Sequence, residues 1–276
     1  MKVLIAIFFG LIALTGCASS PSMLRPDCHT PSGLQLLPAS GLVTFGELHG
    51  TVESPQFVSR VACAMSSAGR PVVVALEWPS DLQPSIDEYI NLPTADISRV
   101  TSNAFFNGSN DGRASGAMIQ LVRDIKKLRT NGANISIAAF DAGRNASPSN
   151  RDASRDVMMA MNLRDVLQKN SNALVLALTG NIHSRIVRGV AWNAALEPMM
   201  FHLRDLSTLS LNVLHETGSA WVCSNSECGP KAFRGNAEFR EIAPNRPVGL
   251  VLDSLTEGHN GYYYVGKLSP SSPFNK

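Results

Sequence analysis

The chain has 276 residues, of which 44% are apolar and 17% are charged, and its formal net charge is +2. This composition is typical of a folded globular domain with a sizeable core, and it excludes a disordered chain and a collagen-like repeat. The longest basic run is Lys126-Lys127, so the sequence predicts a small-molecule substrate and no nucleic-acid partner.

The chain begins with a pattern typical of secretion. Lys2 is followed by an apolar run at 3–14 and then by Leu14-Thr15-Gly16-Cys17. The run is too short for a membrane-spanning helix, which needs roughly twenty residues, and it is typical of a signal peptide.

A cysteine directly after Leu-Thr-Gly resembles the lipobox of bacterial lipoproteins. The resemblance implies a signal peptide at 1–16, lipidation of Cys17, and attachment to the membrane through that lipid. Because Ala18 is not aspartate, it also implies the periplasmic face of the outer membrane. The alternative is a plain signal peptide with an incidental cysteine.

Residues 17–40 are rich in serine and proline and are expected to be a tether, which leads into a single domain at 41–276. In this domain apolar, β-branched runs alternate with segments of helical periodicity. In chain order, we expect a strand at 42–47, a helix at 55–67, a strand at 72–77, an irregular region at 80–112, a helix at 114–128, a strand at 135–140, a helix at 154–167, and strands at 173–178, 210–215, 248–252 and 262–265. This alternation predicts an α/β fold with a mostly parallel central sheet flanked by helices.

Four cysteines remain when Cys17 is set apart. An even number of cysteines in an oxidising compartment predicts two disulfides, for which three pairings exist. Only four residues separate Cys223 from Cys228, which favours a bond between these two and leaves Cys28 to pair with Cys63. A metal site built from the same four cysteines is the alternative, although their spacing lacks a C-x-x-C motif.

Polar side chains follow four of the predicted strands at the points where the strands end. They are Glu47 with His49, Glu77, Asp141 and His183. The carboxyl ends of parallel strands meet at one edge of a sheet, so we expect these side chains to form one site. Two imidazoles among carboxylates suit either acid–base work on a water molecule or binding of a divalent metal. For each acid taken alone, the alternative is a solvated loop residue or a helix cap.

Four short segments in this order and spacing resemble the erythromycin esterase and ChaN-like superfamily, over roughly 42–185. They are Gly46-Glu47-Leu48-His49-Gly50-Thr51, Ala75-Leu76-Glu77, Arg151-Asp152 with Met158-Met159-Ala160-Met161-Asn162, and Gly180-Asn181-Ile182-His183. The resemblance implies the α/β fold already predicted. It also implies one of three activities, because the superfamily includes macrolide esterases without an obligatory metal, lipoproteins associated with haem or iron, and metalloproteins of the TraB/Tiki type.

The resemblance also implies roles for individual residues. His49 would be the general base, oriented or polarised by Glu47 and Glu77, and His183 would be the second catalytic imidazole. Arg60, on the helix after the first motif, would hold a carboxylate or an oxyanion of the substrate.

Three further residues are candidates for substrate binding. Asp141 ends the third strand, Arg185 comes two positions after His183, and Trp78 directly follows Glu77. The alternative for Trp78 is that it fills the core.

These observations together predict an envelope lipoprotein that hydrolyses an ester or a similar bond and requires no cofactor. One alternative is a protein that binds haem or iron, for which Tyr262-Tyr263-Tyr264 is a candidate ligand segment. Another is a metal-dependent hydrolase of the Tiki type, with Glu47, His49 and His183 as ligands of a divalent metal.

Overall fold

The computed structural model describes residues 27–108, 112–142, 155–224, 227–235, 246–252 and 258–275. The predicted signal peptide, Cys17 and the first part of the predicted tether lie outside these residues, as does the segment Arg151-Asp152. Within the described residues, no helix has the length and apolar character needed to cross a bilayer.

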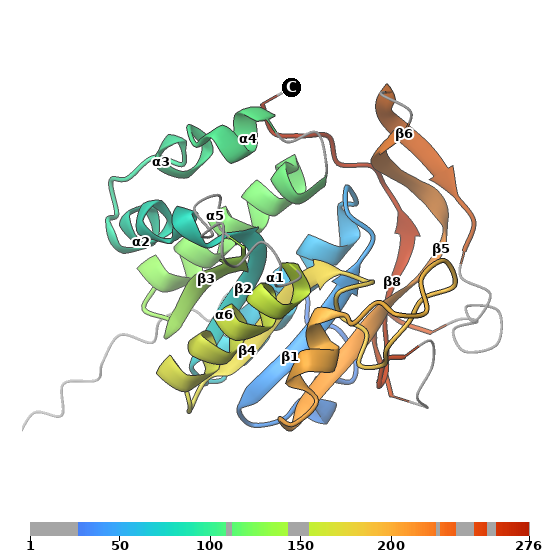
Figure 1. Ribbon diagram of the computed structural model, residues 1–276. Helices are drawn as coiled ribbons and strands as arrows, with labels where there is room; N and C mark the ends of the chain where they lie inside the picture. Colours follow the sequence, from blue (N-terminus) through green and yellow to red (C-terminus); the bar gives the residue numbers. More distant parts are fainter. Residues whose placement is uncertain are drawn as a thin grey trace, which may run out of the picture.

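A mixed sheet of eight strands forms the centre of the molecule (Figure 1). The strands are β1 (Gly41–Glu47), β2 (Val72–Pro79), β3 (Ile135–Asp141), β4 (Leu174–Gly180), β5 (Thr208–Ser224), β6 (Glu227–Phe233), β7 (Gly249–Val251) and β8 (Gly261–Leu268). Their order is β3-β2-β4-β1-β5-β8-β7, with β6 paired to β5. All pairs from β3 to β8 are parallel, whereas β6 and β7 run antiparallel to their neighbours. The predicted α/β fold with a mostly parallel sheet is confirmed.

Helices cover both faces of this sheet. They are α1 (Glu53–Ser67), α2 (Gln83–Asn91), α3 (Ser98–Thr101), α4 (Ala104–Gly108), α5 (Gly116–Thr130) and α6 (Arg155–Lys169), with short 3-10 turns η1 (Leu34–Leu36), η2 (Ser80–Leu82), η3 (Gly112–Ala114) and η5 (Met199–Leu203). The prediction of an irregular region at 80–112 was wrong, since it contains α2, α3 and α4. These helices have nine residues or fewer, and so short a segment shows little helical periodicity in the sequence.

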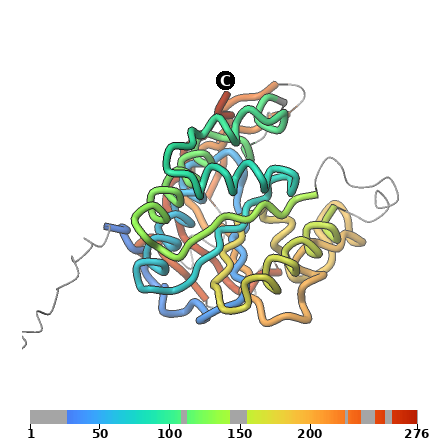
Figure 2. Tube along the Cα trace, turned by 90° about the vertical axis from the view of Figure 1, so that its left-hand side faces the viewer, coloured from blue at the N-terminus to red at the C-terminus, as the bar shows by residue number. Residues whose placement is uncertain are grey.

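Alternate residues of the strands pack into two separate cores. Val43 and Phe45 of β1 face α1, α2 and α5, whereas Leu42 faces α6 and η5. Figure 2 shows α6 apart from the layer that contains α2 and α5. Because both faces are covered, the central strands are apolar along almost their whole length, which is the pattern on which the prediction rested. The charged residues of β1, β2 and β3 therefore lie near the strand ends.

Two disulfides are present, and both match the predicted pairing. Cys28 is bonded to Cys63, which ties the N-terminal arm to α1. Cys223 is bonded to Cys228 across the hairpin of β5 and β6. The hairpin itself was not predicted, because β5 continues well beyond the expected strand at 210–215.

Candidate functional site

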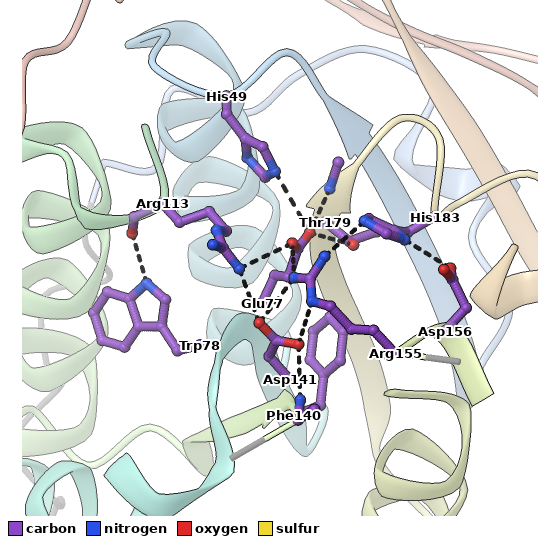
Figure 3. A network of polar contacts seen from close by, with 12 residues as sticks. His49, Glu77, Trp78, Arg113, Phe140, Asp141, Arg155, Asp156, Thr179 and His183 are labelled. Atoms are coloured by element: carbon purple, nitrogen blue, oxygen red, sulfur yellow. Dashed lines mark hydrogen bonds and ion pairs between the residues drawn. The ribbon is translucent and has the colours of Figure 1, made fainter. Parts of the chain in front are cut away.

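Glu77 is the buried centre of a polar cluster at the carboxyl ends of β1 to β4 (Figure 3). Its Oε2 accepts hydrogen bonds of 2.7 Å from the Thr179 hydroxyl and from the Gly180 backbone N–H. Its Oε1 pairs with Arg155 and lies 3.5 Å from Arg113 Nη1. The carboxylate thus joins the end of β2 to the end of β4 and holds two guanidinium groups.

His49 lies above Glu77, between two carboxylates. Its Nδ1 is 2.9 Å from Glu47 Oε1, its Nε2 is 3.6 Å from Glu77 Oε2, and 27% of its side chain is exposed. A carboxylate only accepts hydrogen bonds, so this arrangement suits a ring that is protonated on both nitrogens. Burial by itself lowers the pKa of His49, but the charges of Glu77 and Glu47 outweigh it and raise the pKa to about 10.

The contact between His49 and Glu77 also shifts the pKa of Glu77. Burial by itself raises the pKa of Glu77, but the neighbouring charges of His49 and Arg155 lower that pKa well below its usual range. His49 and Glu77 therefore form an ion pair at neutral pH. This resting state is the opposite of the one that a general base at His49 requires, because a base must begin without the proton.

His183 has a different environment from His49. Its Nδ1 is 2.6 Å from Asp156 Oδ1, and its Nε2 is 2.9 Å from Arg155 Nη1. A guanidinium group only donates hydrogen bonds, so Nε2 accepts and the ring proton is on Nδ1, donated to Asp156. Asp156 also accepts a hydrogen bond of 2.7 Å from the Met199 backbone N–H, which fixes the carboxylate. These partners suit a ring that donates from Nδ1 and accepts at Nε2.

Asp141 and two arginines complete the floor of the cluster. Asp141 Oδ1 accepts from Arg155 Nε, and Oδ2 accepts from Arg155 Nη2 and Arg113 Nη1, each at 2.8 Å. Burial lowers the pKa of Arg155, but its hydrogen bonds to Asp141 and the charge of Glu77 raise it above its usual value. The two arginines offset the charges of two buried carboxylates, which would otherwise be costly to bury.

Glycines allow the turn that carries His49 to fit its surroundings. Gly50 has φ of 79°, and a Cβ on it would lie 2.2 Å from the Trp221 carbonyl oxygen. On the other side, a Cβ on Gly112 would lie 1.8 Å from the Gly50 nitrogen. The Trp221 N–H donates to the Gly50 carbonyl at 2.9 Å. The β5 strand and the η3 turn thus clamp the turn after His49 between two backbones.

The structure brings five of the predicted site residues together: Glu47, His49, Glu77, Asp141 and His183. Their catalytic and substrate-binding roles remain predictions.

Of the other three predicted substrate-binding residues, Trp78 is buried beside the cluster and Arg60 lies outside it. Trp78 is fully buried against Phe106, and its indole N–H donates to the Arg113 carbonyl at 2.7 Å. Trp78 therefore fills the core, where a substrate does not reach it, and it holds the backbone of Arg113. Arg185 lies against Gly258. Arg60 lines a pocket of about 240 Å³ beside α1 and α5, and none of the lining residues belongs to the polar cluster.

Four residues of the cluster were missed in the sequence: Arg113, Arg155, Asp156 and Thr179. Arg155-Asp156 repeats the dipeptide Arg151-Asp152, which carries part of the family resemblance. The resemblance therefore pointed to an Arg-Asp dipeptide in this region, and the structure places Arg155-Asp156 in the cluster. The sequence has no comparable signal for Arg113, which reaches the cluster through tertiary packing alone.

The residues predicted as metal ligands are not arranged as a metal site, and the predicted haem-ligand segment is buried. Across the described parts of the chain, no group of three or more His, Cys, Asp or Glu residues is arranged to hold a metal ion. Glu47, His49 and His183 lie in the same cluster but do not form a set of metal ligands, since both ring nitrogens of His183 contact Asp156 and Arg155. Residues Tyr262–Tyr264 are buried in β8 and offer no exposed haem ligand.

Comparison with known proteins finds likeness in structure and not in sequence. No family model matches the chain, and no curated protein matches it by sequence. An erythromycin esterase in its open conformation has a TM-score of 0.59 at 11% identity, covering 87% of this chain and 89% of that one. A protein of Bacillus cereus has a TM-score of 0.58 at 11% identity, covering 87% and 91%. A succinoglycan biosynthesis protein has a TM-score of 0.56 at 10% identity, covering 86% and 90%. The chain therefore has the fold of erythromycin esterase, as the sequence resemblance predicts.

Proposed function

We propose that the protein is a hydrolase that cleaves an ester or a similar acyl bond with water activated at the polar cluster. The observation that carries the proposal is the pair of partly exposed imidazoles above buried Glu77, each with its Nδ1 held by a carboxylate. Because each Nδ1 is held by a carboxylate, we assign proton exchange with a substrate or a water molecule to Nε2, which lies beside Glu77 in His49 and beside Arg155 in His183. The fold shared with an erythromycin esterase is consistent with this chemistry.

The experiment is a screen of the purified protein against 4-nitrophenyl esters of increasing acyl length and against lactones. We expect turnover by the wild-type protein. His49→Ala and Glu77→Gln are expected to lower kcat/KM at least about 100-fold, because each removes a group that sets proton transfer at the site. Circular dichroism verifies that both variants are folded.

His29→Gln is the matched control, because His29 lies beside Asp27 in the exposed N-terminal arm and is expected to keep wild-type turnover. The proposal is wrong if the wild-type protein hydrolyses nothing in the screen, or if folded His49→Ala keeps the wild-type rate.

Two additions to the screen separate the alternatives. A chelator is expected to leave turnover unchanged, whereas a loss that added Zn²⁺ reverses would favour a metal-dependent hydrolase. Titration with haem tests the remaining alternative, and a Soret band that His49→Ala weakens would favour a haem-binding protein.

A further inference from the structure

We infer that the two imidazoles divide the acid–base work: the Asp156–His183 pair takes the proton from water, and His49 gives a proton to the leaving group. This inference rests on the proposed hydrolase function and assigns roles within the same site. It departs from the role implied by the sequence resemblance, in which His49 is the base.

The hydrogen-bond partners of the two rings carry the assignment. His49 has a carboxylate at each ring nitrogen, Glu47 at 2.9 Å and Glu77 at 3.6 Å, so it holds two protons and is ready to donate one. His183 has a carboxylate at Nδ1 and a guanidinium group at Nε2, so its Nε2 carries a lone pair and is ready to accept a proton. Two titratable groups in opposite environments are the usual sign of an acid and a base in one site.

Both rings pack over Gly180. A Cβ placed on Gly180 would lie 3.0 Å from His49 Nε2 and 3.5 Å from His183 Cδ2, the ring atom bonded to Nε2. Because Gly180 has no side chain, both rings approach its backbone closely and their edges lie near each other. Both rings are partly exposed, so a scissile bond and a water molecule that arrive from the solvent side would lie within reach of both ring edges.

The two rings act on the ester in two successive steps. A water molecule gives a proton to His183 Nε2 while its oxygen forms a bond to the acyl carbon, and the carbonyl π electrons move to the oxygen. The tetrahedral intermediate re-forms the carbonyl and breaks the bond to the leaving oxygen, which takes the proton from His49 Nε2. The products are a carboxylic acid and an alcohol, and transfer of one proton from His183 to His49 through solvent restores the resting state.

Arg155 donates its Nη1 to the lone pair of His183 that would receive the water proton. In the reacting complex we assign this lone pair to water, while Arg155 stays attached to Asp141 through Nε and Nη2. The Arg155 side chain is 38% exposed, which leaves space on its outer side. Asp156 is a positioning residue, because it keeps the proton of His183 on Nδ1 and the lone pair on Nε2.

The first test uses the wild-type protein and needs no substrate. Nitrogen-15 NMR of the histidine rings at about pH 8, with signals assigned from His49→Gln and His183→Gln, reports which ring nitrogens carry protons. We expect His49 to be protonated on both nitrogens and His183 on Nδ1 alone. A neutral His49, or a His183 with its proton on Nε2, would overturn the inference.

The second test is chemical rescue by imidazole, which titrates near neutral pH. We expect imidazole to raise the turnover of His183→Ala at least about tenfold, with a gain that grows with pH because the neutral base is the active form. For His49→Ala the gain is expected to fall with pH, because the imidazolium form is active. Imidazole added to Glu77→Gln, which keeps both rings, is the control and is expected to give no gain.

The outcomes separate the inference from the proposed function. Rescue with the opposite pH dependences overturns the division of roles and leaves the hydrolase intact. Failure of the wild-type protein to hydrolyse any ester overturns the hydrolase, and the inferred division of catalytic roles with it. If an alanine variant does not fold, the NMR measurement on the wild-type protein decides the inference.

Discussion

His49 has Glu47 and Glu77 beside its two ring nitrogens, and His183 has Asp156 and Arg155. The two side chains are chemically identical, so the difference between them comes entirely from what the fold places within hydrogen-bond distance. For His49 this difference appears as a pKa raised to about 10, since the charges of two carboxylates outweigh the effect of burial. The partners of each ring thus set its protonation, and with it the chemistry available to it.

The raised pKa of His49 predicts a pH-dependent contribution to stability. A group whose pKa is higher in the folded state stabilises that state fully below its unfolded pKa of about 6.5, and the effect is lost as the pH rises through about 10. We expect His49→Gln to lower the free energy of unfolding by more at pH 6 than above pH 10, by about 4 kcal/mol. Urea unfolding of both proteins at the two pH values measures this. A difference between them that stays constant with pH would contradict the prediction.

Gly180 packs against the His49 ring, so a side chain at this position is expected to disturb the site. Gly180→Ala places a methyl group 3.0 Å from His49 Nε2, which is so close that the His49 ring must shift. We expect kcat/KM to fall at least about 100-fold, because the reacting atoms lose their position between acid and base. Gly229→Ala is the matched control, since a Cβ there meets no atom within 4 Å. Equal turnover of the two variants would show that the position of the His49 ring over Gly180 does not matter for the reaction.

At the scale of the elements, the ends of strands β1 to β4, the start of α6 and the η3 turn supply the cluster, and the β5–β6 hairpin supports it from outside. The Trp221 backbone of β5 holds the Gly50 turn that follows His49, and the Cys223–Cys228 disulfide closes the same hairpin. The other disulfide, between Cys28 and Cys63, holds the N-terminal arm on α1. One disulfide therefore holds the N-terminal arm, and the other holds the end of the β5–β6 hairpin.

The sizes of the two closed loops predict unequal effects on stability. Cys28 and Cys63 are 35 residues apart, whereas Cys223 and Cys228 are 5 apart. From loop-closure entropy, replacing the first pair by serine is expected to lower the free energy of unfolding by about 4 kcal/mol, and replacing the second pair by about 2 kcal/mol. Urea denaturation of the two double variants measures both losses. A larger loss from the second pair would mean that the hairpin does more than its loop length predicts.

At the scale of the whole molecule, the sequence pattern before the described residues predicts how the domain is held in the cell. Cys17→Ser is expected to abolish labelling of the protein with palmitate and to release it from the membrane fraction, because a lipid on Cys17 is the predicted anchor. Fractionation of cells that produce the two forms, followed by immunoblotting, measures the release. Cys28→Ser, which removes a disulfide cysteine, is the control and is expected to stay in the membrane fraction. A Cys17→Ser protein that remains membrane-bound would contradict the predicted anchor.

The sequence by itself determined the α/β fold, because buried parallel strands must be apolar until they end, and their ends must then meet at one edge. For the same reason it identified Glu47, His49, Glu77 and His183 as neighbours, and a short loop of four residues was enough to pair Cys223 with Cys228. Strand periodicity predicts where a strand ends and which side chains lie at that end. It does not predict which residues from distant parts of the chain contact those side chains.

Tertiary structure alone decided the rest. Arg60 is only eleven residues from His49, yet its place on α1 puts it in the pocket beside α5. Arg113 and Arg155 come from separate parts of the chain and meet at Asp141 and Glu77. Protonation depends on such contacts, since Coulomb interactions and hydrogen bonds depend on distances of a few ångströms that spacing along the chain does not contain.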